Sequence, residues 1–250
     1  MPEAFFLPDG DRYVATELTR GPWDPGSQHA GPPAALVGRE IERAGRLDRG
    51  RLARVTYEIV RPIPIGPVTV TAQVTRPGRS VELVDASLHG EKGDELVRAR
   101  AWRIRSTEVD LDGGLVPHDP PPPGPAELAP GDFFPTGQEI GYHTAMEARF
   151  ASGAFLELGP ATAWFRMRCP LVAGEEPTPL DRVLAAADSG NGISATLDFH
   201  RYLFVNTDLT VGLMRPPAGE WVCLESATYP EPSGVGLTDT ALWDERGRIG

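Results

Sequence analysis

The chain has 250 residues, and its 24 Lys and Arg against 35 Asp and Glu give a formal net charge of −11. Such an acidic surface repels the phosphate backbone of DNA and RNA, so the composition argues against a nucleic-acid partner. Hydrophobic content of 40% and charged content of 24% are ordinary for a globular protein, and no apolar run reaches the roughly 18 residues that a membrane span needs.

In chain order, the first half predicts a strand, a helix and then four strands. The first strand is expected at Tyr13–Arg20, and the helix begins at Pro32–Pro33, because the fixed φ of proline suits a first turn. Apolar residues then recur at helical spacing, at Ala34, Val37, Ile41 and Ala44. Alternating apolar and polar residues predict strands at 54–60, 68–74, 80–88 and 96–104, with a hairpin turn at 90–93.

The second half begins after a proline-rich segment, Val116–Pro125. This segment predicts an extended linker, because proline has no N–H to give to a sheet. After it we expect a strand at Tyr142–Phe150 and a second helix that Thr178 caps. Gly190 and Gly192 are expected to end this helix.

The two halves of the chain repeat one another. Residues 54–96 aligned on 208–250 at a constant offset of 154, without gaps, share ten identical residues, against about three expected by chance. Among the identities are Thr56 with Thr210 and Arg61 with Arg215. The constant offset argues against a chance match between strand-rich segments, so each half is one copy of a unit in which a helix covers an antiparallel sheet.

The fold class that follows is α+β, with two fused copies of an antiparallel sheet wrapped around one long helix and paired edge to edge. We expect the first copy at residues 1–106, the linker at 107–138 and the second copy at 139–250. At the offset of 154, Gly250 corresponds to Leu96, where the last strand of the first copy begins. The sequence therefore predicts that the second copy lacks its final strand and that the natural chain continues beyond Gly250.

Four segments carry a resemblance to a known family. They are Gln28–Leu36, Arg61–Pro62, Pro179–Gly192 and Asn206–Thr210. With the repeat and the central linker, they make the chain similar to the double-hotdog acyl-CoA thioesterases, the family of bacterial thioesterase II. The resemblance implies a double hotdog fold, a place in fatty-acid metabolism, and hydrolysis of a fatty-acyl or related acyl-CoA thioester by an activated water, with no cofactor and no metal.

The family holds that water with an Asp at the helix, a Thr or similar polar residue on the following strand, and a Gln on the last strand. The resemblance places the Asp at Asp188 and the polar residue at Asn206, where this chain departs from the usual Thr. Thr210, further along the same strand, is the third candidate. The position of the Gln falls beyond Gly250.

Asp188 also stands out without the family. It continues the apolar stripe of the second helix, so it lies on the face meant for burial. It also lies in the last turn, where the helix dipole disfavours an anion. Both effects penalise the charged carboxylate, which suits a general base. The alternative is a structural Asp that binds the loop amides of Ser189–Gly192.

Asn206, Asp208 and Thr210 are expected on one face of the strand, because side chains alternate along it. The first copy lacks the acid and the amide at the corresponding positions, so one active site is expected, at the second helix. We interpret Asp208 as an ordinary surface residue, and a polar outer face is the alternative for the other two.

A second candidate site, Asp24 with His29, resembles the dyad of hotdog enoyl-CoA hydratases, which add water across a double bond. The alternative is a loop histidine beside a turn. A hydratase that uses Asp24 and His29, and a non-catalytic acyl-thioester binder, therefore stand as the two alternatives to a thioesterase.

Other chemistries find little support in the sequence. The histidines lack metal-ligand spacing, no P-loop or serine-nucleophile motif occurs, and the dinucleotide-like Gly190–Ala195 follows a helix instead of a strand. Cys169 and Cys223 are interpreted as buried thiols of a cytoplasmic protein, because the N-terminus carries no secretory signal. We interpret Arg61 and Arg215, each before a proline, as strand-end charges rather than phosphate clamps. The expected partners are the acyl-CoA substrate and, as an option, further copies of the pseudo-dimeric chain.

Overall fold

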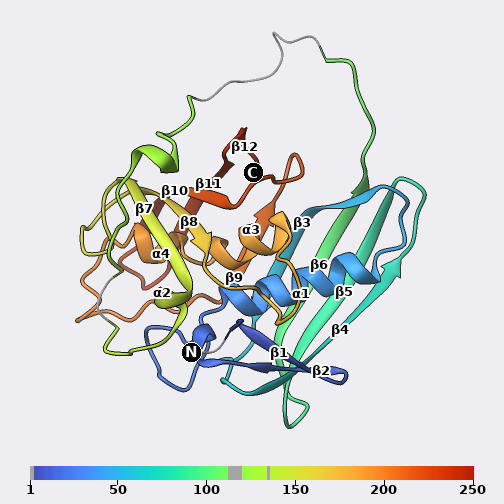
Figure 1. The fold of residues 1–250 in the computed structure, drawn as a ribbon, viewed down its shortest axis with the longest axis horizontal. Coiled ribbons are helices and arrows are strands. Elements are labelled where there is room, and N and C mark those ends of the chain that lie inside the picture. The colour runs from blue at the N-terminus through green and yellow to red at the C-terminus, as the bar shows by residue number, and fades with distance from the viewer. Residues whose placement is uncertain (1–2, 112–119, 134–135) are drawn as a thin grey trace.

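The computed structural model describes residues 3–111, 120–133 and 136–250 (Figure 1). Within these residues, the strands form a seven-stranded sheet in the order β1-β2-β4-β5-β6-β3-β9 and a five-stranded sheet in the order β12-β11-β10-β8-β7. The first sheet consists of β1 (Phe6–Asp9), β2 (Arg12–Ala15), β3 (Gly50–Ile59), β4 (Pro67–Arg76), β5 (Val81–Gly90), β6 (Glu95–Arg105) and β9 (Asp208–Gly212). The second consists of β7 (Met146–Ser152), β8 (Ala161–Met167), β10 (Trp221–Pro230), β11 (Gly236–Asp244) and β12 (Gly247–Arg248).

Each sheet packs against one main helix. Helix α1 (Gly31–Ala44) contacts β4 and β5 of the first sheet, and α3 (Pro179–Ala187) contacts β10 and β8 of the second. The two helices also contact each other, and Figure 1 shows them between the two sheets. Two antiparallel sheets, each wrapped around a helix, form the double hotdog of the α+β class that the sequence predicted.

Helix α3 begins where the sequence predicted, α1 begins one residue earlier than predicted, and both bury the predicted faces. In α1, Val37 and Ile41 are fully buried. At the start of α3, the Thr178 hydroxyl accepts the N–H of Asp181 at 3.1 Å, and the Asp181 carboxylate accepts the N–H of Thr178 at 2.8 Å. This reciprocal cap satisfies two backbone donors that the first turn would otherwise leave without a partner.

The strand expected at Tyr13–Arg20 is shorter than the sequence suggested. Strand β2 ends at Ala15, and Glu17–Thr19 form a 3-10 turn. Thr16 starts that turn, because its hydroxyl accepts the N–H of Leu18 at 3.3 Å. A threonine that caps a turn has the same composition signal as a threonine inside a strand, and this explains the error.

Two further boundaries differ in the second copy. The strand expected at Tyr142–Phe150 begins only at Met146, after a helical turn, α2 (Tyr142–Ala145). The glycines that were expected to end the second helical segment instead lie in another short helix, α4 (Gly190–Ile193). Its last turn is closed by Ser194, whose hydroxyl donates to the carbonyl of Gly190 at 2.8 Å.

The two copies join through an antiparallel pairing of β3 with β9. Thr56 lies opposite Thr210, and their hydroxyl oxygens are 3.1 Å apart. These threonines occupy the same position of the two copies at the offset of 154. An approximate two-fold axis therefore passes between them, and the chain is a pseudo-dimer joined along this seam.

The last residues of the chain pair with β11 on the side opposite β10. Strand β12 pairs with Trp243 and Asp244, and the backbone of Ile249 and Gly250 bonds to Leu242. By the repeat, β11 and β9 correspond to β5 and β3, between which β6 runs in the first copy. The sequence-based prediction of a further strand after Gly250 stays a prediction.

Glycines allow α1 and α3 to approach each other closely. A Cβ atom on Gly31 would lie 2.1 Å from the carbonyl oxygen of Ala185, and one on Gly38 would lie 2.1 Å from Cδ1 of Leu184. The first contact is the more restrictive, because a backbone oxygen cannot rotate away as a leucine methyl can. This approach places the first turn of α1 against the last turn of α3.

We expect Gly31→Ala to lower the free energy of unfolding by about 2 kcal/mol, because the added methyl overlaps the backbone of Ala185. Gly212→Ala is the matched control, since a Cβ atom there would meet nothing within 4 Å. Urea unfolding of both variants measures the difference. Equal stability of the two would show that the close approach of the helices is not required.

Around Pro123 and Pro125, the linker lies against the outer face of the second sheet. Trp164 Nε1 donates to the carbonyl of Pro123 at 2.8 Å, and the Arg149 guanidinium donates to the carbonyl of Pro125 at 2.8 Å. Arg149 also lies over the Trp221 ring, 4.9 Å from its centroid. Of the predicted linker segment Val116–Pro125, residues 116–119 lie outside the described residues.

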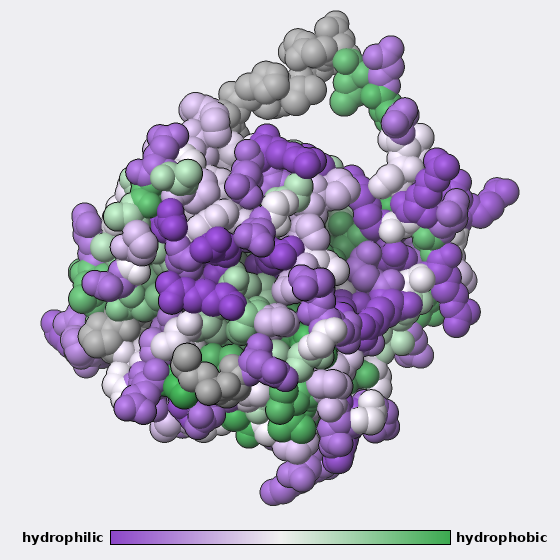
Figure 2. All heavy atoms as spheres, in the orientation of Figure 1, coloured by the Kyte–Doolittle hydropathy of each residue, from purple (hydrophilic) through white to green (hydrophobic). Residues whose placement is uncertain are grey.

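Hydrophilic side chains cover most of the face shown in Figure 2, and hydrophobic ones form separate small patches. Among the described helices, none has the length and apolar character to cross a bilayer. Cys169 and Cys223 are free thiols, and Cys223 is buried as predicted, whereas Cys169 is only partly buried. Burial raises the pKa of Cys169 to about 12 and that of Cys223 well above its usual value. Both thiols therefore stay protonated and unreactive at neutral pH.

Candidate functional site

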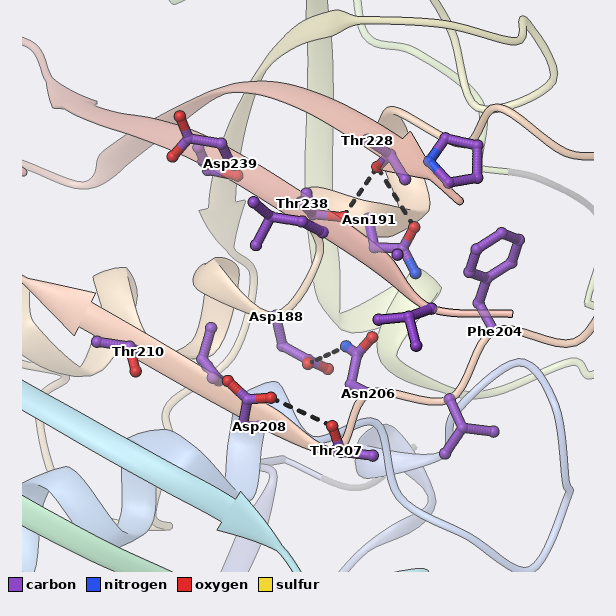
Figure 3. Close-up of a pocket in the computed structure, with 18 of the residues that line it drawn as sticks. Asp188, Asn191, Phe204, Asn206, Thr207, Asp208, Thr210, Thr228, Thr238 and Asp239 are labelled. Carbon is purple, nitrogen blue, oxygen red and sulfur yellow. Dashed lines mark hydrogen bonds between the residues drawn. The ribbon is translucent and has the colours of Figure 1, made fainter. Parts of the chain in front are cut away.

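Asp188 caps the C-terminal end of α3, and its side chain is only 6% exposed. Its two carboxylate oxygens have different partners. Asn206 Nδ2 donates to Oδ1 at 2.8 Å, and His29 Nδ1 lies 3.2 Å from Oδ2. Figure 3 shows Asp188 and Asn206 directed toward each other from the end of α3 and from the segment before β9. The structure thus brings together two of the three residues that the sequence predicted.

His29 comes from the first copy, just before α1. Its Nδ1 accepts the backbone N–H of Gly31, the first residue of α1, at 3.1 Å. Because that nitrogen accepts, the neutral imidazole carries its proton on Nε2. Nε2 has no hydrogen-bond partner among the described residues and is not an enclosed atom. The imidazole therefore presents a free N–H donor.

The Tyr142 ring stacks on the imidazole of His29 and fixes its orientation. The two ring centroids are 3.8 Å apart, with 3° between the planes. The Tyr142 hydroxyl donates to the carbonyl of Ala185 at 2.9 Å and lies 2.9 Å from the hydroxyl of Ser189. Burial raises the pKa of Tyr142 far above neutrality, so the phenol stays protonated. His29 is therefore fixed by α1 on one side and by the end of α3, through Tyr142, on the other.

Burial also sets the charge of His29. Removal from water lowers the pKa of His29 below its ordinary value, and the nearby negative charge of Asp188 offsets only part of this effect. The ring is thus neutral at pH 7, when it can donate from Nε2 but carries no positive charge.

Thr210 does not belong to this cluster. Its hydroxyl bonds to Thr56 on the outer face of the first sheet, whereas its neighbour Val211 is buried on the inner face. The expectation that Asn206, Asp208 and Thr210 share one face is wrong for Asn206. Strand β9 begins only at Asp208, so Asn206 lies outside the alternation and turns toward the end of α3 (Figure 3).

Asp24 and His29 do not form the dyad that the sequence suggested. The exposed Asp24 carboxylate accepts the hydroxyl of Ser27 at 2.6 Å and the N–H of Gly26 at 3.0 Å. These two hydrogen bonds lower the pKa of Asp24. The carboxylate beside His29 is Asp188 instead, and Asp24 stabilises the turn, which is the alternative considered from the sequence.

The pair of His29 with Asp188 was missed because the two residues belong to different copies. When a two-fold axis perpendicular to two packed helices relates them, the helices run antiparallel, so the start of one lies beside the end of the other. The repeat in the sequence implies this arrangement. It therefore predicts that residues just before α1 lie near Asp188 at the end of α3.

A cavity of about 430 Å³ opens beside the cluster of His29, Asp188 and Asn206, and all three line it. Much of its remaining wall is apolar and comes from both copies, including Trp23, Ile59, Ile63, Phe133, Tyr142, Phe155 and Phe204. The rings of Phe133 and Phe155 stack with centroids 4.5 Å apart. An apolar cavity with one polar cluster suits a ligand with an apolar group joined to a single reactive polar centre.

A second cavity, of about 500 Å³, lies between β9 and β11 and also reaches Asp188 and Asn206. Its wall is rich in hydroxyl and carboxylate groups, among them Thr228, Thr238 and Asp239 (Figure 3). In the first copy the corresponding space is occupied by β6. Within the described residues, no three His, Cys, Asp or Glu side chains converge as metal ligands would.

Comparison with protein families gives two matches that together span most of the chain. A family model described as the acyl-CoA thioesterase N-terminal domain matches residues 19–104. A model described as the acyl-CoA thioesterase C-terminal domain matches residues 119–249. No curated protein matches the sequence.

Solved structures resemble the whole chain at low sequence identity. A proposed thioesterase II from Thermobifida fusca has a TM-score of 0.72 and 18% identity over 98% of this chain and 92% of its own. A hot dog protein from Alicyclobacillus acidocaldarius has a TM-score of 0.70 and 14% identity, with 98% and 91% covered. The acyl-CoA thioesterase II TesB2 from Mycobacterium marinum has a TM-score of 0.63 and 16% identity, with 96% and 88% covered. These likenesses establish the fold.

Proposed function

This chain belongs to the acyl-CoA thioesterase family, and we propose on that basis that it hydrolyses acyl-CoA thioesters at the cluster of His29, Asp188 and Asn206. The observation that carries the proposal is a nearly buried carboxylate at the edge of an apolar cavity, held on one oxygen and facing a neutral imidazole on the other. The acyl group lies in the apolar cavity, and its carbonyl lies at the polar cluster.

Asp188 is the general base. Asn206 donates a hydrogen bond to Oδ1, and this bond fixes the carboxylate. His29 Nδ1 lies 3.2 Å from Oδ2, but its single lone pair already accepts the N–H of Gly31, so it offers Oδ2 no hydrogen bond. Oδ2 is therefore the carboxylate oxygen that takes the proton of the attacking water.

His29 supplies the electrophilic part of the reaction. Its Nε2–H donates to the thioester carbonyl oxygen, where negative charge develops as water adds to the carbonyl carbon. A neutral donor fixed by Tyr142 and Gly31 needs no reorganisation at that moment. The tetrahedral intermediate then expels the CoA sulfur with its electron pair, and the thiolate takes the proton that Asp188 received from the water, which restores the carboxylate. The products are a carboxylic acid and free CoA thiol.

The proposal is tested by incubating the purified protein with a panel of saturated and enoyl acyl-CoA thioesters and following thiol release with a thiol-specific dye. Thiol release that needs the protein supports the thioesterase. Loss of the enoyl absorbance without thiol release would instead support a hydratase. Binding of acyl-CoA with neither reaction would leave a non-catalytic binder.

A further inference from the structure

Arg215 and its counterpart in the first copy, Arg61, have different environments. Arg215 forms a double contact with the buried carboxylate of Asp244, at 2.7 Å from Nη1 and 2.5 Å from Nη2. Burial alone would raise the pKa of Asp244, but its bonds to Arg215 and to two backbone N–H groups lower it overall. Arg61 is exposed and forms no ion pair with any described residue. Arg215 thus stabilises the fold through an ion pair, whereas Arg61 has no such role.

The two copies differ at the position of the acidic partner. At the offset of 154, the counterpart of Asp244 is Gly90, which has no side chain to offer. A Cβ atom on Gly90 would lie only 2.9 Å from a carboxylate oxygen of Asp94, so the space beside it is already filled. The first copy therefore keeps the arginine but has no acidic side chain at the position that pairs with it in the second copy. The carboxylate of Asp94 lies beside Gly90, yet among the described residues it forms no ion pair with Arg61.

Arg61 lies at the candidate active site. It lines the 430 Å³ cavity together with His29 and Asp188. Another arginine of that wall, Arg20, pairs with Glu17 at 3.0 Å and so has its charge balanced. On a chain whose net charge is −11, an exposed guanidinium without an acidic partner beside the cavity is a local attraction for anions.

We propose that Arg61 binds a phosphate group of the CoA moiety at the mouth of the cavity, an inference that rests on the proposed hydrolysis of acyl-CoA. A guanidinium presents paired donors that match phosphate oxygens. The exposed position of Arg61 fits the part of the substrate that stays in water, whereas the acyl group occupies the apolar interior. Arg61 is therefore a ligand-binding residue, in contrast to the strand-end charge inferred from the sequence.

The test compares Arg61→Ala with the wild-type protein on two thioesters of one acyl group. Acyl-CoA carries the phosphates, and the acyl thioester of N-acetylcysteamine does not. We expect Arg61→Ala to raise KM for acyl-CoA about tenfold with kcat nearly unchanged, in the range of one charge-assisted contact. KM for the N-acetylcysteamine thioester is expected to stay the same. High salt is expected to reduce the difference in KM for acyl-CoA between Arg61→Ala and the wild-type protein, because salt screens the contact between charges.

Arg79→Ala is the matched control, because Arg79 is exposed and its loss changes the net charge equally. An equal rise in KM for both thioesters, or in Arg79→Ala as well, would overturn the proposal. An effect confined to acyl groups that carry a carboxylate would assign Arg61 to the acyl end and would also overturn it.

Calorimetric binding of CoA separates this proposal from hydrolysis itself. If the wild-type protein releases no thiol, the proposed function fails, yet weaker CoA binding by Arg61→Ala would still support the phosphate contact. If hydrolysis occurs and both CoA affinity and KM are unchanged in Arg61→Ala, only the assignment of Arg61 is wrong.

Discussion

Asp188→Asn is expected to lower kcat for thiol release at least about 10²-fold, because the amide cannot take the proton of the attacking water. The fold is expected to survive. The new amide can accept from Asn206 through its oxygen, so the one hydrogen bond that the structure gives the carboxylate side chain has a replacement. Removing an anion from the end of α3 favours the helix dipole, so the thermal unfolding temperature is expected to stay or rise.

Asp24→Asn is the control for this result. Its carboxylate is exposed and serves a turn, so thiol release is expected to change less than twofold. Steady-state rates of both variants on one acyl-CoA, with circular dichroism to confirm folding, make the comparison. Full activity in a folded Asp188→Asn protein would remove Asp188 from the mechanism.

Three substitutions of His29 separate its chemistry from its packing. Gln places an N–H near the position of Nε2, Asn places one only near Nδ1, and Ala places none. We expect His29→Ala and His29→Asn to lower kcat about 10²- to 10³-fold, the usual cost of losing an oxyanion donor. His29→Gln is expected to retain most of the rate. A merely structural histidine would instead give losses that follow the unfolding temperatures of the three variants.

A spectroscopic measurement tests the same assignment. In the Asp188→Asn background, a bound ¹³C-labelled thioester is expected to show a lowered carbonyl stretching frequency, because Nε2–H withdraws electron density from the oxygen. Adding His29→Ala is expected to return the frequency toward its value in water. An identical frequency with and without His29 would exclude this donor role.

The lowered pKa of His29 also predicts how stability depends on pH. As the pH falls below about 6.5, the unfolded chain protonates this histidine while the folded chain does not. The unfolded state then binds more protons, so stability is lost as the pH falls from neutrality toward the lower pKa of the folded state. Urea unfolding at pH 7.5 and 5.5 is expected to show a larger loss for wild type than for His29→Gln. Equal losses would mean that His29 is not held neutral.

Much of the fold was predictable because the chain carries it twice. A constant offset relates Thr56 to Thr210, and edge-to-edge pairing of the copies places the two opposite each other. Helix starts were predictable from capping chemistry that is local in sequence, as at Thr178. Asp188 was predictable as well, because its position on an apolar helical stripe already indicated burial.

The partners of Asp188 were harder to predict for two physical reasons. Asn206 reaches it only because β9 begins two residues later, and a strand boundary is a cooperative result of pairing with β3. His29 reaches it across the pseudo-dimer through the close approach at Gly31. Neither contact can be predicted from the spacing of residues that are close in sequence. Asp24 and His29 are close in sequence and suggested a dyad, but they do not form one.

The two-fold relation between the copies has a consequence for how such a chain can evolve. In a dimer of identical subunits every substitution appears twice, so one residue position must serve both subunits in the same way. A fused chain has no such restriction: the position that holds Asp244 in one copy holds Gly90 in the other. Duplication followed by fusion therefore lets the same arginine position stabilise the fold in one half and, as proposed, recognise the substrate in the other.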